Sequence, residues 1–95
     1  MKNSNINLFQ IIIKYQKGLD MVKITGTNTY IDVAIDDRTV RISGELIVGG
    51  FVCYKSSMTN WLIPENEPLT EEDKNEIIQK VTEKTAGSHM VITFE

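Results

Sequence analysis

Alternation of apolar and polar residues between positions 30 and 54 constrains the fold of this 95-residue chain more than any other feature. Ile31, Val33 and Ile35 are separated by single residues. A period of two is typical of a strand that buries one face against a core. The same period continues through positions 40–48, so this part of the chain is expected to form antiparallel strands.

The dipeptide Asp37-Arg38 is expected to act as a two-residue hairpin loop between the first two alternating segments. This loop predicts that Ile35 lies opposite Val40 on the apolar face. It also brings Asp32 diagonally close to Arg41 on the polar face, within reach of a charge contact. A slip of one residue would turn one apolar set outward, which favours this register.

A second loop is expected at Gly49-Gly50, because glycine adopts a positive φ without steric cost. It predicts that Val48 lies opposite Phe51 on the core face. Together with a short strand at residues 22–25, these segments predict a four-stranded antiparallel meander. Its outer face is mixed in character and includes Tyr54, so we expect that face to be partly covered or used for contact.

The C-terminal part of the sequence predicts one amphipathic helix followed by a last strand. Thr70 is a suitable N-cap, and Asp73 stands at the capping-box position. Ile77 and Val81 share one helical face. Residues 90–94 alternate again and are expected to return to the sheet. The fold class is therefore α+β: the four-stranded meander, a C-terminal helix packed on it, and a final strand.

Residues 1–20 differ from the rest of the chain and form an N-terminal extension to a single domain at residues 21–95. Gln10 interrupts the apolar run and no small-residue cleavage site follows, which argues against a signal peptide. The run is too short to cross a membrane. One hypothesis is that Met21 is the true start of the protein. If the extension is ordered, we expect a short helix packed through its Ile and Phe side chains.

The residues that usually carry catalysis or bind metals are scarce. The chain has one cysteine, Cys53, and one histidine, His89, so an intramolecular disulfide is impossible. A structural zinc site needs four ligands, and no nucleophile motif surrounds any serine. We therefore expect no enzyme activity and no cofactor or metal. A net charge of -3 argues against a nucleic-acid partner.

The segment from Trp61 to Glu76 is the best candidate for meeting a partner. Its acidic residues face two interpretations: they offset the helix dipole and solvate a loop, or they form a negative surface that attracts a basic partner. Trp61 is either a core residue or a partly exposed anchor, since tryptophan is enriched among binding hot spots. The candidate partner-binding residues are Trp61, Pro64, Glu65, Glu67, Glu71, Glu72 and Tyr54.

The motif formed by Ser56-Ser57, Trp61, Pro64, Pro68-Leu69-Thr70 and Ile77-Ile78 resembles the immunity protein 74 family. The likeness extends from about Met21 to Glu95. It implies a cytoplasmic bacterial protein that neutralises a toxin of a polymorphic toxin system by stoichiometric binding. The family offers no catalytic residues to carry over. An acidic surface would suit a basic toxin such as a nuclease.

An alternative is a small non-catalytic interaction or regulatory module. Such a protein would use the apolar residues on the outer face of the sheet, and a homodimer is one form it would take. A toxin gene beside this one would favour the immunity interpretation.

Overall fold

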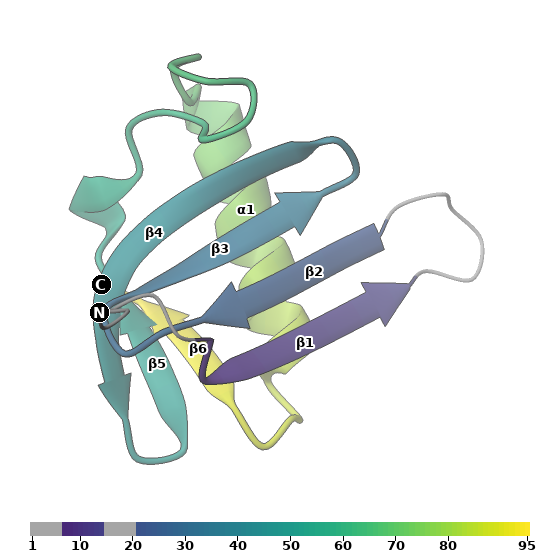
Figure 1. Ribbon diagram of the computed structural model, residues 1–95, viewed down its shortest axis with the longest axis vertical. Coiled ribbons are helices and arrows are strands. Elements are labelled where there is room, and N and C mark those ends of the chain that lie inside the picture. The colour runs from purple at the N-terminus through teal and green to yellow at the C-terminus, as the bar shows by residue number, and fades with distance from the viewer. Residues whose placement is uncertain (1–6, 15–20) are drawn as a thin grey trace, which may run out of the picture.

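The computed structural model describes residues 7–14 and 21–95 and shows an α+β fold with one curled, mixed sheet and one α-helix (Figure 1). The strand order is β1-β2-β3-β4-β5-β6. Strands β1 to β5 pair antiparallel in sequence order, whereas β6 pairs parallel to β5. The elements are β1 (Phe9–Lys14), β2 (Met21–Gly26), β3 (Tyr30–Ile35), β4 (Arg38–Ile47), β5 (Gly50–Cys53), the 3-10 helix η1 (Lys55–Ser57), α1 (Glu71–Thr85) and β6 (Val91–Phe94).

The predicted four-stranded meander corresponds to β2–β5. The predicted final strand is β6, which pairs with β5, and β1 adds a strand that was not predicted at the other edge. The expected N-terminal helix is wrong: residues 9–14 form β1, which pairs with the free edge of β2. Three consecutive isoleucines explain this, because β-branched side chains favour strands over helices. Phe9 lies opposite Gly26, and its ring occupies the space that a side chain at Gly26 would need. Residues 1–6 and 15–20 of the extension lie outside the described residues.

The first hairpin has a different loop from the predicted one. Its loop is Asp36-Asp37, and Val33 pairs with Val40. Asp36 has a φ of 56°, a conformation that aspartate tolerates better than most residues. The predicted pairing of Ile35 with Val40 was therefore wrong by two residues. A shift of two leaves every side chain on its expected face, so the apolar pattern alone did not distinguish the two registers.

The second hairpin is corrected in the same way. Its loop is Val48-Gly49, and Leu46 pairs with Phe51. Gly49 has a φ of 77°, which fixes where the turn occurs. Val48 was expected on the core face but is fully exposed at the loop.

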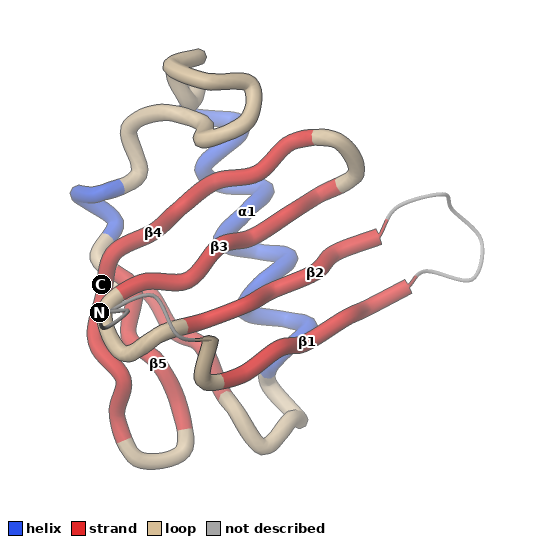
Figure 2. The backbone as a smooth tube through the Cα atoms, viewed as in Figure 1, coloured by secondary structure: helices blue, strands red, loops and turns tan. Residues whose placement is uncertain are grey.

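Strand β4 bends so that the sheet curls on itself, as Figure 2 shows. Residues 38–43 pair with β3 and residues 44–47 pair with β5. A side chain at Gly44 would collide with the Val52 carbonyl oxygen, so glycine permits this close crossing. The curl brings the ring of Phe9 in β1 to 6.3 Å from the ring of Phe51 in β5, centroid to centroid.

Helix α1 crosses one face of the curled sheet (Figure 1). Ile77 and Val81 point into the core, as predicted. Thr85 is also fully buried; its hydroxyl donates to the Val81 carbonyl at 2.9 Å and accepts from the Ile92 N–H at 3.0 Å. The helix is thereby joined to β6 by a hydrogen bond. The buried apolar core comprises Val22, Ile24, Ile31, Val33, Val40, Ile42, Phe51, Cys53, Met58, Trp61, Leu69, Ile77, Val81 and Ile92.

Candidate functional site

The connection from Thr59 to Leu69 is held closed by its own backbone. The Trp61 N–H donates to the Glu67 carbonyl at 2.8 Å, and the Leu69 N–H donates to the Thr59 carbonyl at 2.9 Å. Asn66 turns the chain with a φ of 67°, and the Ile63–Pro64 peptide bond is cis. The proline-containing loop that the sequence predicted is therefore a closed loop with defined hydrogen bonds.

This loop is also fastened to the edge of β4. The Thr39 N–H donates to the Ile63 carbonyl, and the Leu62 N–H donates to the Thr39 carbonyl, both at 2.8 Å. Leu62 and Ile63 remain 39% and 54% exposed. These two large apolar side chains are therefore exposed on a backbone that is fixed by hydrogen bonds within the loop and to β4.

Trp61 lies beneath this loop, with only 5% of its surface exposed. The Arg38 guanidinium covers its ring, with Cζ 4.2 Å from the ring centroid, and pairs with Glu67 at 3.5 Å. The indole N–H makes no hydrogen bond of standard geometry, although it lies close enough to the Asp73 carboxylate to lower the pKa of that group. An unsatisfied buried donor typically costs about 1–3 kcal/mol. The indole is therefore a packed residue with one unsatisfied polar group.

The first turn of α1 is capped as the sequence predicted. The Thr70 hydroxyl accepts from the Asp73 N–H at 2.9 Å, and the Asp73 carboxylate accepts from the Thr70 N–H at 3.0 Å. The Thr70 N–H is the main reason that the pKa of Asp73 lies below its ordinary value. Arg38 and the nearby Trp61 N–H lower that pKa further. Asp73 therefore interacts both with the N-cap residue of α1 and with the indole of Trp61.

The β3–β4 loop adds two carboxylates to this region that sequence reasoning missed. Asp36 and Asp37 line a pocket together with Asp73 and Glu76 of α1. The loop, the closed connection and the start of α1 all lie at the same end of the molecule (Figure 1). We call this the acidic end, defined by Asp36, Asp37, Glu65, Glu67, Glu71, Glu72, Asp73 and Glu76.

Most of the candidate residues share this end. Pro64, Glu65, Glu67, Glu71 and Glu72 are all exposed there, with Trp61 buried below them. Sequence reasoning missed exposed Leu62 and Ile63, and also Arg38. Two apolar residues directly after the tryptophan are visible in the sequence. Whether their side chains are exposed depends on how the loop attaches to β4, which the sequence alone does not show.

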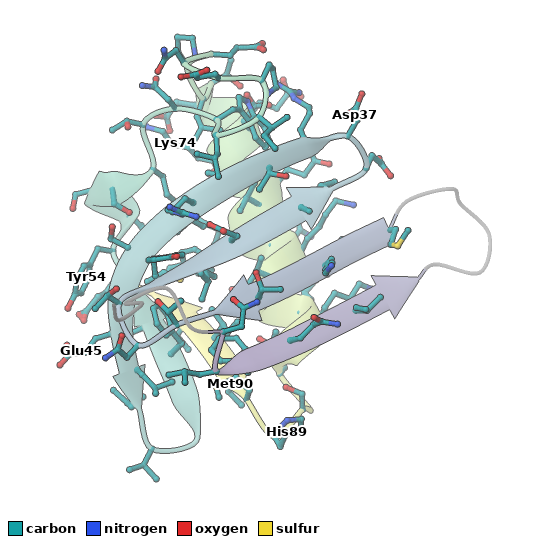
Figure 3. The ribbon with its side chains drawn as sticks, viewed as in Figure 1. Asp37, Glu45, Tyr54, Lys74, His89 and Met90 are labelled. Carbon is teal, nitrogen blue, oxygen red and sulfur yellow. The ribbon has the colours of Figure 1, made fainter. Side chains whose placement is uncertain are left out.

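Tyr54 is the exception among the candidates. Figure 3 shows it beside Glu45, away from Asp37 and Lys74 at the acidic end. Its hydroxyl donates to the Glu45 carboxylate at 3.0 Å. This hydrogen bond raises the pKa of Tyr54 above its ordinary value. Tyr54 therefore belongs to a different surface from the other candidate residues.

Cys53 and His89, the two side chains considered above for catalysis, lie outside the acidic end. Cys53 is buried in β5, as expected, and burial raises the pKa of its thiol to about 12. His89 is exposed in the turn before β6 (Figure 3). Among residues 7–14 and 21–95, no cluster of three or more His, Cys, Asp or Glu side chains is arranged to hold a metal ion. None of the helices in these residues has the length and hydrophobicity needed to span a membrane.

Comparison with known proteins adds the decisive observation: the family model of immunity protein 74 matches residues 23–95. The chain belongs to the immunity protein 74 family. The resemblance that the tryptophan-proline motif suggested is thereby confirmed. No curated protein and no solved structure matches the chain. In this immunity protein 74 member, the matched region includes every residue of the acidic end.

Proposed function

We propose that this chain neutralises a cognate bacterial toxin by direct, stoichiometric binding through its acidic end. The proposal builds on membership of the immunity protein 74 family and on the surface just described. The toxin would be met in the cytoplasm of the bacterium that makes it. Inhibition would come from occupation of a toxin surface, with no covalent step.

The observation that carries the proposal is the convergence of carboxylates from three separate segments. The β3–β4 loop, the closed connection and the first turns of α1 contribute to the same end. A concentrated negative field accelerates association with a basic partner. A nuclease fits this description because its own substrate is polyanionic. Fast capture matters for a protein that must act before its toxin does damage.

Leu62 and Ile63 supply an apolar contact area, which charge attraction alone does not provide. Stable interfaces have an apolar core inside a polar rim. Leu62 and Ile63 are apolar and exposed, and Glu65 and Glu67 follow directly in the same loop. Their backbone is fixed to Thr39, so little loop entropy is lost on binding. In this arrangement Trp61 supports the contact surface from below.

Co-expression with the C-terminal domain of the toxin encoded beside this gene tests the proposal. We expect the wild-type chain to restore growth and to co-purify with the toxin domain at a 1:1 ratio by native mass spectrometry. Failure of both rescue and co-purification would overturn it. A stable homodimer in light scattering without rescue would favour the alternative interaction module.

A pair of variants locates the surface. Ile63→Asp places a charge in the proposed apolar centre and should abolish rescue. Val48→Asp is the matched control, because Val48 is fully exposed in the β4–β5 loop at the opposite end. Equal rescue by both variants would show that the loop is not the contact surface.

A further inference from the structure

We infer that the pocket in the acidic end receives a basic side chain of the partner protein, most suitably an arginine. This inference rests on the proposed function and assigns a specific contact within it. The pocket has a volume of about 160 Å³ and opens at the surface between the β3–β4 loop and α1. Cavities of about 150 Å³ accommodate a benzene-sized group, which is the scale of a planar guanidinium with part of its stem.

The lining has the composition that a cationic side chain requires. Its charged residues are Asp36, Asp37, Asp73 and Glu76, opposed by the single guanidinium of Arg38. Its apolar walls come from Ile35, Ile77 and Trp61. Carboxylates on several sides suit the forked donors of arginine, while apolar walls accept its aliphatic stem. The pocket therefore matches both parts of the same side chain.

Arg38 shows that this region already accepts a guanidinium. Its Cζ lies 4.2 Å from the centroid of the Trp61 ring, and it pairs with Glu67, which is outside the pocket lining. The carboxylates of Asp36, Asp37 and Glu76 form no ion pair with it. Glu76 instead has a long contact of 3.9 Å to Lys80. Even with both Arg38 and the more distant Lys80 counted against its four carboxylates, the pocket keeps a net negative charge.

The indole of Trp61 provides a second, independent observation. Trp61 is 95% buried, it lines the pocket, and its N–H makes no hydrogen bond of standard geometry. This N–H is directed toward Asp73, another lining residue. A buried donor without an acceptor is rare in folded proteins and is commonly satisfied by a ligand or water. The pocket wall at Trp61 is therefore not fully satisfied by the hydrogen-bonding groups of the chain itself.

The probe for this site is N-acetyl-L-argininamide, which carries a guanidinium and two amide carbonyls. Its neutral isostere, N-acetyl-L-citrullinamide, is the control ligand. Because the chain has one tryptophan, a single indole N–H resonance in the ¹H–¹⁵N NMR spectrum reports on the pocket. We expect a saturable shift with the arginine compound that weakens in high salt. An equal response to the citrulline compound would overturn charge recognition.

Two double variants complete the design. Asp37→Asn/Glu76→Gln neutralises two lining carboxylates outside the helix cap and should weaken binding about fivefold. Glu71→Gln/Glu72→Gln removes the same charge from the same end outside the lining and should leave binding within about twofold. Equal weakening by both pairs would overturn the pocket in favour of a diffuse field. A native-like spectrum for each variant is required before comparison.

Co-expression separates this inference from the proposed function. Rescue by the wild type that is reduced more strongly by Asp37→Asn/Glu76→Gln than by Glu71→Gln/Glu72→Gln would support the pocket contact. Undiminished rescue by both double variants would overturn the pocket contact while leaving neutralisation intact. Absence of rescue by the wild-type chain would overturn the proposed function, and the pocket contact with it.

Discussion

The Arg38 guanidinium lies over the Trp61 ring, with its Cζ 4.2 Å from the ring centroid. Arg38 is the first residue of β4, and Trp61 lies in the loop whose residues Leu62 and Ile63 are hydrogen-bonded to Thr39 of the same strand. The contact joins the sheet to the acidic end. It also places the only cation of the pocket lining above its unsatisfied indole.

Removal of the Arg38 charge should destabilise the packing of Trp61 against β4. Arg38→Gln loses the cation–π contact and the exposed ion pair with Glu67, with an expected loss of about 0.5–1.5 kcal/mol in the free energy of unfolding. Acrylamide should quench Trp61 fluorescence more strongly in the variant, because the guanidinium shields the ring. Urea denaturation measures the first effect. Quenching identical to that of the wild type would show that Arg38 does not cover the indole.

Truncation of Trp61 should be severe. Trp61→Ala should cost about 3–5 kcal/mol, a large part of the 5–15 kcal/mol that stabilises a typical domain. Trp61→Phe should cost clearly less, because phenylalanine fills part of the space and removes the unsatisfied N–H. Thermal unfolding followed by circular dichroism compares the two. If Trp61→Phe proved as damaging as Trp61→Ala, the N–H would have a partner that stabilises the fold.

The hydroxyl of Thr85 should matter more than its methyl group. Thr85→Val keeps the shape but leaves the Ile92 N–H without its acceptor, at an expected cost of about 1–3 kcal/mol. Thr85→Ser keeps the oxygen and loses only a methyl group, with an expected cost of about 1 kcal/mol. Urea denaturation of both variants shows which one loses more unfolding free energy. A smaller loss in Thr85→Val than in Thr85→Ser would contradict this role.

The capping carboxylate of Asp73 predicts a dependence of stability on pH. Folding lowers the pKa of Asp73, so the ionised group stabilises the fold fully above the unfolded-state pKa. This contribution is lost as the pH falls from about 4 through the lower folded-state pKa. The difference in unfolding free energy between wild type and Asp73→Asn should be constant near neutrality and shrink below about pH 4. A difference that stayed constant to pH 2 would contradict the lowered pKa.

The sequence predicted those features that depend on neighbours along the chain. The alternation around Ile31 and Val33 identified the strands and their buried face, since side-chain direction in a strand follows a period of two. Thr70 and Asp73 marked the start of α1, because a capping box involves residues three apart. Burial of Cys53 also followed from its place in a strand.

Hairpin registers were harder to predict, because both corrections were shifts of two residues, which leave the residues that remain paired on their expected faces. The choice of loop depended on which residue accepts a positive φ, and Asp36 and Gly49 do so in the structure. Strand β1 was missed for a different reason. A short run of isoleucines becomes a strand only when another strand offers a free edge, and that edge belongs to β2.

The sequence by itself determined the strands, the capped helix, and the family to which the tryptophan-proline motif belongs. The tertiary structure alone decided that Asp36 and Asp37 join Asp73 and Glu76 around one pocket, and that Trp61 lies under Arg38. Local patterns fix the conformation of neighbouring residues. Which distant residues meet depends on how the curled sheet and α1 pack, and no short-range pattern encodes that geometry.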